Sequence, residues 1–360
     1  MMINFKKFYF LFLIITFLFA IACSTDAENN SEVNLESEEM NDNDRSEEIP
    51  EDTNDSESTE EEGNNSDTPL TTNLRTFIFG HSLLVHDPPA IATPSNETTV
   101  PHWMAELSNA ASYEYAVSGQ YGFLTQHANL PPFAQWGFDR AEGAWDSDNE
   151  TFAAANFNSI LLTAGNFIQY QPATVPYDGD NPNNTSPLLA TLEIFDWVET
   201  QEPGMAIYIY ENWPDMAGFL NNGIPATTAE FENFNEYTLG EFHDWWLTYH
   251  ETVIEERPGL NVKMIPVGPI ISKLLTETDL ANIPFFDLYE DDAPHGRPTI
   301  YFLASLITYM AMFGVEAPNN YVVPNTVHSF VANNYESTID FIWKELQDFN
   351  NDEGNSLVFP

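Results

Sequence analysis

Three separated points of the chain carry residues that together could perform acyl transfer. They are Ser82, just after the apolar run 77–79, then Asn166, and finally Asp292 with His295 in an Asp-x-x-His pattern. A serine hydroxyl becomes a nucleophile when a histidine accepts its proton, and a carboxylate holds that histidine in the required tautomer. An amide donor stabilises the oxyanion of the tetrahedral intermediate. Taken singly, each residue also has a structural interpretation, such as a helix N-cap, a turn residue or a surface charge.

The elements that must position these residues alternate between short apolar runs and longer helical patterns. Near-continuous apolar runs predict parallel strands at Thr76–Phe79, Tyr113–Val117, Ser159–Thr163, Ala206–Tyr210 and Val262–Val267. Helices are predicted from about Val100, from Pro187, and over Phe231–Glu255, Thr299–Phe313 and Ser337–Phe349. The alternation predicts a three-layer α/β/α domain with a mainly parallel, flavodoxin-like central sheet of about five strands. Ser82 and Asn166 both follow predicted strands, at the sheet edge where such folds bind ligands.

In this order the residues resemble the SGNH (GDSL-type) hydrolase superfamily, over about residues 76–313. The resemblance is carried by Gly80-His81-Ser82-Leu83, by the glycine of Val117-Ser118-Gly119-Gln120, by Ala164-Gly165-Asn166-Phe167 and by Asp292-Ala293-Pro294-His295. It implies that Ser82 is the nucleophile, His295 the proton acceptor and Asp292 the group that orients it. It also implies an oxyanion hole made by the backbone N–H groups of Ser82 and Gly119 and the side chain of Asn166. No metal or organic cofactor is implied.

Two features near these blocks bear on the site. His81 stands where the family has an aspartate, so a second histidine adjoins the nucleophile. We prefer His295 as the base, because a side chain next in sequence to the nucleophile normally points elsewhere. Glu211 and Trp213 follow the fourth predicted strand and, with His81, are candidates for lining a substrate cleft. An ordinary loop is the alternative for that segment.

The first 72 residues have the composition of a targeting segment and a tether. Lys6 and Lys7 precede an apolar run at 8–21, and the run leads to Cys23, the only cysteine. The resemblance of residues 1–22 to a lipoprotein signal peptide implies cleavage before Cys23 and lipid on its thiol; an ordinary secretory signal is the alternative. Residues 23–72 are predicted to be an acidic disordered tether, because 18 Asp and Glu lie between positions 26 and 67 against one arginine. The hydrolase-like domain is expected to occupy residues 73–360.

The charge of the chain limits its partners. The formal net charge is −46, which repels nucleic acid, so we expect no nucleic-acid binding. A saline habitat would explain the acidity equally well. The resemblance predicts a serine ester hydrolase of the bacterial cell envelope, periplasmic or on the cell surface, held to the membrane only through its lipid. Its expected substrate is an acylated small molecule or polysaccharide, as for a carbohydrate O-deacetylase. The alternatives are a catalytically degenerate glycan-binding lipoprotein on the same fold, and a lipid-directed esterase or thioesterase.

Overall fold

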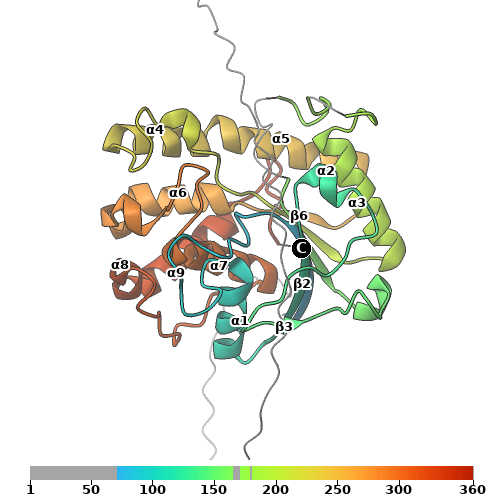
Figure 1. Ribbon diagram of the computed structural model, residues 1–360, viewed down its shortest axis with the longest axis horizontal. Coiled ribbons are helices and arrows are strands. Elements are labelled where there is room, and N and C mark those ends of the chain that lie inside the picture. Colours follow the sequence, from blue (N-terminus) through green and yellow to red (C-terminus); the bar gives the residue numbers. More distant parts are fainter. Residues whose placement is uncertain (1–70, 165–170, 179–180, 360) are drawn as a thin grey trace, which may run out of the picture. The chain divides into compact units, whose positions relative to one another are not determined.

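The apolar runs of the sequence form one parallel sheet that is covered by helices on both faces (Figure 1). The computed structural model describes residues 71–164, 171–178 and 181–359. Within these residues the sheet has the strand order β3-β2-β1-β4-β5-β6. The strands are β1 (Asn73–Gly80), β2 (Glu114–Tyr121), β3 (Glu142–Gly143), β4 (Ser159–Leu162), β5 (Ala206–Tyr210) and β6 (Val262–Ile265). The predicted α/β/α fold is therefore correct, with six strands in place of about five.

Helices connect the strands as right-handed crossovers require. The α-helices are α1 (Val100–Ala111), α2 (Leu124–His127), α3 (Pro187–Gln201), α4 (Thr228–Leu239), α5 (Glu241–Glu256), α6 (Val267–Glu277), α7 (Pro298–Phe313), α8 (Ser329–Asn333) and α9 (Tyr335–Asp348). Short 3₁₀ turns lie at Phe152–Ala155, Ala217–Phe219, Asp279–Asn282 and Phe285–Asp287. Among these described helices, none has both the length and the apolar composition that crossing a bilayer needs.

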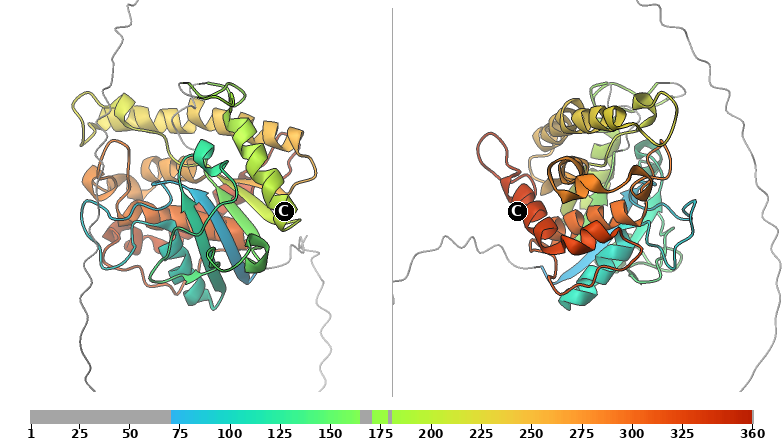
Figure 2. Two further views of the ribbon diagram at one scale, coloured as in Figure 1. Left: turned by 45° about the vertical axis from the view of Figure 1, so that its right-hand side comes forward. Right: turned by 90° about the vertical axis from the view of Figure 1, so that its left-hand side faces the viewer.

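The two faces of the sheet carry two separate hydrophobic cores. On β1, Leu74 and Ile78 point to the core beneath α1, α6 and α7, whereas Phe77 and Phe79 point to the core beneath α3 and α5. This follows from the alternation of side chains along a strand. Figure 2 shows the strands side by side between the two helix layers. A strand buried on both faces must be apolar at nearly every position, which is the pattern that the sequence has.

One long helix expected from the sequence is two helices in the structure. The pattern over Phe231–Glu255 breaks at Gly240, which ends α4 and immediately precedes α5. Phe234 of α4 packs in the core of the α6 and α7 layer, whereas Phe242 of α5 packs in the core on the other face. The break lets one aromatic-rich segment cover both faces of the sheet.

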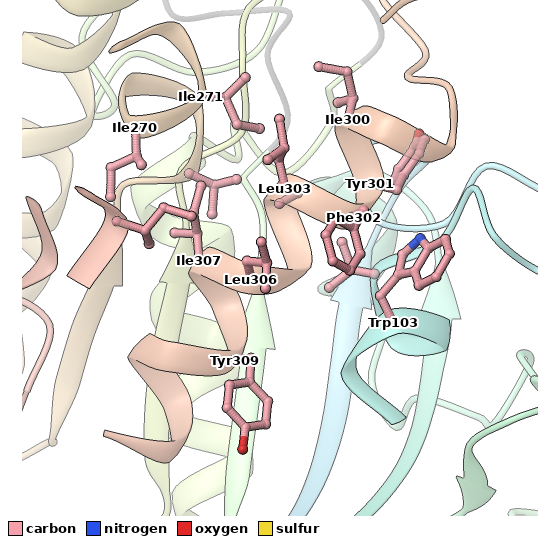
Figure 3. Close-up of a cluster of buried hydrophobic side chains, with 14 of the residues drawn as sticks. Trp103, Ile270, Ile271, Ile300, Tyr301, Phe302, Leu303, Leu306, Ile307 and Tyr309 are labelled. Carbon is pink, nitrogen blue, oxygen red and sulfur yellow. The ribbon is translucent and has the colours of Figure 1, made fainter. Parts of the chain in front are cut away.

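Helix α7 is the most deeply packed element beside the site. Every residue from Thr299 to Phe313 is buried. Figure 3 shows its side chains meeting those of α6 and, through Phe302, the indole of Trp103 on α1, with ring centroids 5.2 Å apart. The first turn of α7 is therefore a fixed support, and it carries Tyr301 toward the carboxyl ends of the strands.

The strand order reverses direction next to β1. Strand β1 pairs with β2 on one side and with β4 on the other, and both pairings are parallel. Where the strand order reverses in this way, the connections that follow the two adjacent strands run in opposite directions. A crevice is therefore left at the carboxyl ends of these strands. Ser82 follows the end of β1 by two residues, so it lies at this switch point.

Candidate functional site

Ser82 lies in a tight turn that directly follows β1. The N–H groups of Leu84 and Val85 both donate to the carbonyl of His81, at 2.9 and 3.1 Å. Gly80 fits beneath this turn because a Cβ there would lie 2.8 Å from Leu84 Cδ1. Ser82 is partly exposed, and within the described residues neither its N–H nor its hydroxyl has a hydrogen-bond partner. An unpaired backbone N–H can donate to an oxyanion.

The loop before α7 holds the imidazole of His295. A bridge between Tyr289 and Gly296 closes the loop, and the Glu290 N–H donates to the His295 carbonyl at 2.9 Å. The Asp291 carboxylate accepts twice from His295: from its N–H at 2.9 Å and from ring atom Nδ1 at 2.6 Å. With the proton on Nδ1 held by the carboxylate, Nε2 is the free basic nitrogen.

The carboxylate that orients His295 is Asp291, so the expectation that Asp292 does so is wrong. Asp292 is exposed, and its contact with the fold is through its carbonyl, which accepts from the Met216 N–H at 3.1 Å. The loop is folded so that the carboxylate at position 291, four residues before His295, contacts the ring, and the carboxylate at position 292 does not. Desolvation raises the pKa of Asp291, but the hydrogen bonds from His295 outweigh it and hold that pKa below its ordinary value.

Tyr301 links the loop of His295 to the turn of Ser82. Its hydroxyl donates to the Ser82 carbonyl at 2.6 Å, and a Cβ on Gly296 would lie 3.1 Å from its ring. The two segments therefore meet at one tyrosine of α7. Among the described residues, no hydrogen bond joins the Ser82 hydroxyl to His295. Hydrogen bonds of this kind are often long in a free enzyme and shorten when substrate binds.

His81 is enclosed beneath the turn and does not line a cleft as expected. It is 2% exposed; its Nδ1 accepts from the Leu83 N–H at 3.3 Å, and its Nε2 lies 3.3 Å from the Thr163 hydroxyl. That hydroxyl in turn donates to Asn212 at 2.8 Å. Burial lowers the pKa of His81 to about 3, and the nearby His127 and His295 add to the effect. A neutral ring with both nitrogens engaged cannot take the serine proton, so His81 is not the base.

Trp213 and Glu211 are also buried, which contradicts their expected place in a substrate cleft. The Trp213 indole is 0% exposed and its Nε1–H donates to the Pro294 carbonyl at 2.9 Å, next to the catalytic histidine candidate. Glu211 pairs with His243 Nδ1 at 2.8 Å. Burial raises the pKa of Glu211 to about 7, against the lowering effect of His243. Because both side chains are buried beneath the site, they can support it but cannot touch a substrate.

The expected oxyanion hole is altered at Gly119. Strand β2 continues to Tyr121, so Gly119 lies inside it, level with Ile78 and not with Ser82. Its carbonyl accepts from the N–H groups of Gln135 and Trp136, and a Cβ would lie 2.6 Å from the Trp136 ring. The glycine lets this indole pack against the strand.

Asn166, the expected amide donor, and Cys23, the expected lipidation position, lie outside the described residues.

The sequence did not single out His86, whose ring lies against that of His295. The ring of His86 stacks on His295 with centroids 4.0 Å apart and planes 7° apart. Its Nε2 lies 2.5 Å from Glu290 Oε1. The available signals were that His86 follows Ser82 by four residues and that Glu290 begins the acidic run before His295. Neither signal has meaning until the turn and the loop are brought together in space.

A cavity of about 660 Å³ opens beside these histidines. Glu290 and Arg297 contribute its charged wall, and Pro89, Ile91 and Val327 contribute apolar surface. Its size is that of a small-molecule pocket. Neither Ser82 nor His295 lines it, but Glu290 connects it to the stacked rings. No cluster of three or more potential metal ligands is found in the part of the chain that the structure describes.

Comparison with known proteins adds no family to this description. No family model matches the chain, and neither a curated protein nor a solved structure matches it. The site consists of a partly exposed serine whose N–H has no partner among the described residues, and an imidazole paired with a carboxylate on the adjoining loop.

Proposed function

We propose that this chain is a serine ester hydrolase that acts through an acyl-enzyme. The observation that carries the proposal is the pairing of His295 Nδ1 with Asp291, in a loop that Tyr301 ties to the turn of Ser82. A half-buried histidine whose Nδ1 is bonded to a carboxylate has Nε2 left to act as a base, and Ser82 lies at the carboxyl end of β1 on the segment that Tyr301 contacts.

The reaction requires four proton transfers at His295, two in acylation and two in deacylation. Ser82 Oγ attacks the ester carbonyl carbon while its proton passes to His295 Nε2, and the Ser82 N–H donates to the oxyanion. The C–O bond to the alcohol breaks as Nε2 returns the proton to the alcohol oxygen. Water then attacks the acyl carbon while Nε2 takes its proton, and the bond from that carbon to Ser82 Oγ breaks as Nε2 returns the proton to Oγ, which releases the carboxylic acid and restores the serine. Asp291 stays ionised throughout and stabilises the imidazolium. Asn166 is the proposed second donor to the oxyanion.

The test is hydrolysis of a short-chain aryl ester by the purified mature chain. We expect Ser82→Ala to abolish turnover, whereas Ser337→Ala, on the exposed side of α9, leaves it unchanged. A fluorophosphonate probe should label the wild type and spare Ser82→Ala. Turnover that persists in Ser82→Ala would remove the assignment.

A second candidate, a ligand-binding protein on the same fold, is favoured by one observation. The Ser82 hydroxyl makes no hydrogen bond with His295 among the described residues. This candidate predicts that an acylated glycan is retained without turnover and that the fluorophosphonate labels nothing. The same two measurements therefore separate the candidates.

The proposal extends to where the chain acts. Lipid on Cys23 would hold the domain at the cell envelope, and an O-acyl polysaccharide or a small acyl ester is the proposed substrate. Metabolic labelling with palmitate, lost in Cys23→Ser, tests the anchor. The relative rates on acetyl esters and on long-chain acyl esters separate a deacetylase from a lipid-directed esterase.

A further inference from the structure

Two histidine–carboxylate pairs lie one on the other beside Ser82. His295 is bonded to Asp291 at 2.6 Å, and His86 is bonded to Glu290 at 2.5 Å. The imidazoles are nearly parallel, at 7°, with centroids 4.0 Å apart. A separation this short with parallel planes means that one face of the His295 ring is covered by the His86 ring.

Glu290 fixes His86 in that position. Its side chain is only 5% exposed, and besides His86 its two carboxylate oxygens accept from the Ala90 N–H, each at 3.1 Å. The backbone of Glu290 also belongs to the loop of His295, because its N–H donates to the His295 carbonyl. The turn that carries Ser82 and His86 is thereby fastened to the loop that carries His295.

We propose that His86 is a positioning residue for His295, an inference that rests on the proposed esterase function. Asp291 holds one edge of the imidazole, but a hydrogen bond at a single edge leaves the ring free to tilt about that contact. The His86 ring blocks the tilt on one side, so that Nε2 stays directed at the position of the nucleophile. Both constraints together define the plane of the base.

The charges around the stack suit this role. When His295 becomes an imidazolium, a second positive charge 4.0 Å away would oppose it. The Glu290 carboxylate bonded to His86 Nε2 places an acidic group beside the ring that stacks on His295. Asp291 bonds the His295 ring directly, and Glu290 bonds the ring that stacks on it.

A purely structural role makes a different prediction. If His86 only fastens the turn to the loop, its removal lowers stability, and any loss of turnover follows that loss. If it orients the base, a flat ring at position 86 should sustain turnover even without the bond to Glu290. His86→Phe supplies that ring and His86→Ala does not, while both variants remove the same hydrogen bond.

The experiment compares these two variants of the full mature chain on an aryl ester, with kcat, KM and Tm measured for each. We expect His86→Ala to lose roughly 10- to 100-fold in kcat, because small misplacements of a catalytic group cost this much, with KM nearly unchanged. His86→Phe should recover most of kcat at a Tm similarly lowered. Ser337→Ala, on the exposed side of α9, is the control and should retain activity. An NMR ring-current shift on the His295 ring should persist in His86→Phe and vanish in His86→Ala.

Each outcome bears on one proposal. Equal kcat in His86→Ala and wild type overturns the positioning role. A loss of kcat in His86→Ala that His86→Phe does not restore, and that parallels the fall in Tm, overturns it as well. Either result leaves the esterase function standing. Absence of any Ser82-dependent hydrolysis in the wild type removes the esterase function, and the role of His86 with it.

Discussion

The choice between two adjacent carboxylates, Asp291 and Asp292, gives the sharpest test of the site. Replacing Asp291 by Asn keeps an acceptor for the backbone N–H of His295, because the amide oxygen takes the place of Oδ1, which now accepts at 2.9 Å. It places an NH₂ group where Oδ2 now accepts from Nδ1 at 2.6 Å. An amide that donates to Nδ1 forces the ring proton onto Nε2, which can then no longer act as a base.

The magnitude follows from the environment of that bond. A hydrogen bond to a charged group contributes about 1.5–3 kcal/mol, and the Asp291 side chain is 40% exposed, so the lower end applies. A loss of about 1.5 kcal/mol in transition-state stabilisation corresponds to roughly a tenfold fall in kcat. The change of tautomer adds to this, and in triads of this type the Asp-to-Asn change costs on the order of 10⁴-fold. We therefore expect a loss between these two limits.

Asp292→Asn is the matched control, one residue away. Asp292 is exposed and contacts Met216 through its backbone, which the substitution leaves in place. Its kcat on an aryl ester should stay within about twofold of wild type, as surface changes away from the chemistry usually do. Normal activity in Asp291→Asn together with a large loss in Asp292→Asn would refute the assignment and restore the sequence-based expectation.

Three further substitutions test the supports of the site. Trp213→Phe removes the hydrogen bond to the Pro294 carbonyl and should cost about 1–2 kcal/mol in urea unfolding, with a fall in kcat; unchanged stability would contradict it. Gly119→Ala forces a Cβ against the Trp136 ring and should cost about 1–3 kcal/mol, measured in the same way. Burial raises the folded pKa of Glu211 to about 7, despite the attraction of its histidine partner, above an unfolded value of about 4.3. Because the folded state binds the Glu211 proton more tightly than the unfolded state, protonation of Glu211 stabilises the fold. This contribution is complete below about pH 4.3 and is lost as the pH rises through about 7. Plots of Tm against pH should fall less steeply over this range for Glu211→Gln than for wild type, and equal slopes would disprove this account.

Much of the fold could be predicted from the sequence because its strands are buried on both faces. Such strands are short, apolar and bounded by turn residues, so five of the six are visible as runs. The sixth, Glu142–Gly143, is polar and exposed and has no pattern of its own. The break at Gly240 was missed because the aromatic pattern continues across it, and only packing on opposite faces reveals two helices.

The sequence proposes members for the site but does not determine their contacts. Ser82 and His295 could be singled out because each has a recognisable sequence neighbourhood. The carboxylate partner was misassigned because the path of the loop decides whether the side chain at position 291 or 292 returns to the ring. Trp213 was expected in a cleft because composition cannot distinguish an exposed indole from a buried one. The His86 stack required two segments about 200 residues apart to meet.

The direction of β1 has a practical consequence for any assay on a solid support. The described chain enters the sheet at one end of this strand, near Asn73, and Ser82 follows the other end. Eight extended residues separate the two ends by about 26 Å, at roughly 3.3 Å per residue. Beads or sensor chips coupled to the domain near Asn73 would attach at the end of β1 away from Ser82, the proposed nucleophile, leaving the edge of the sheet that carries Ser82 accessible to bulky polymers. Immobilisation through that end is therefore the orientation to choose for polysaccharide substrates.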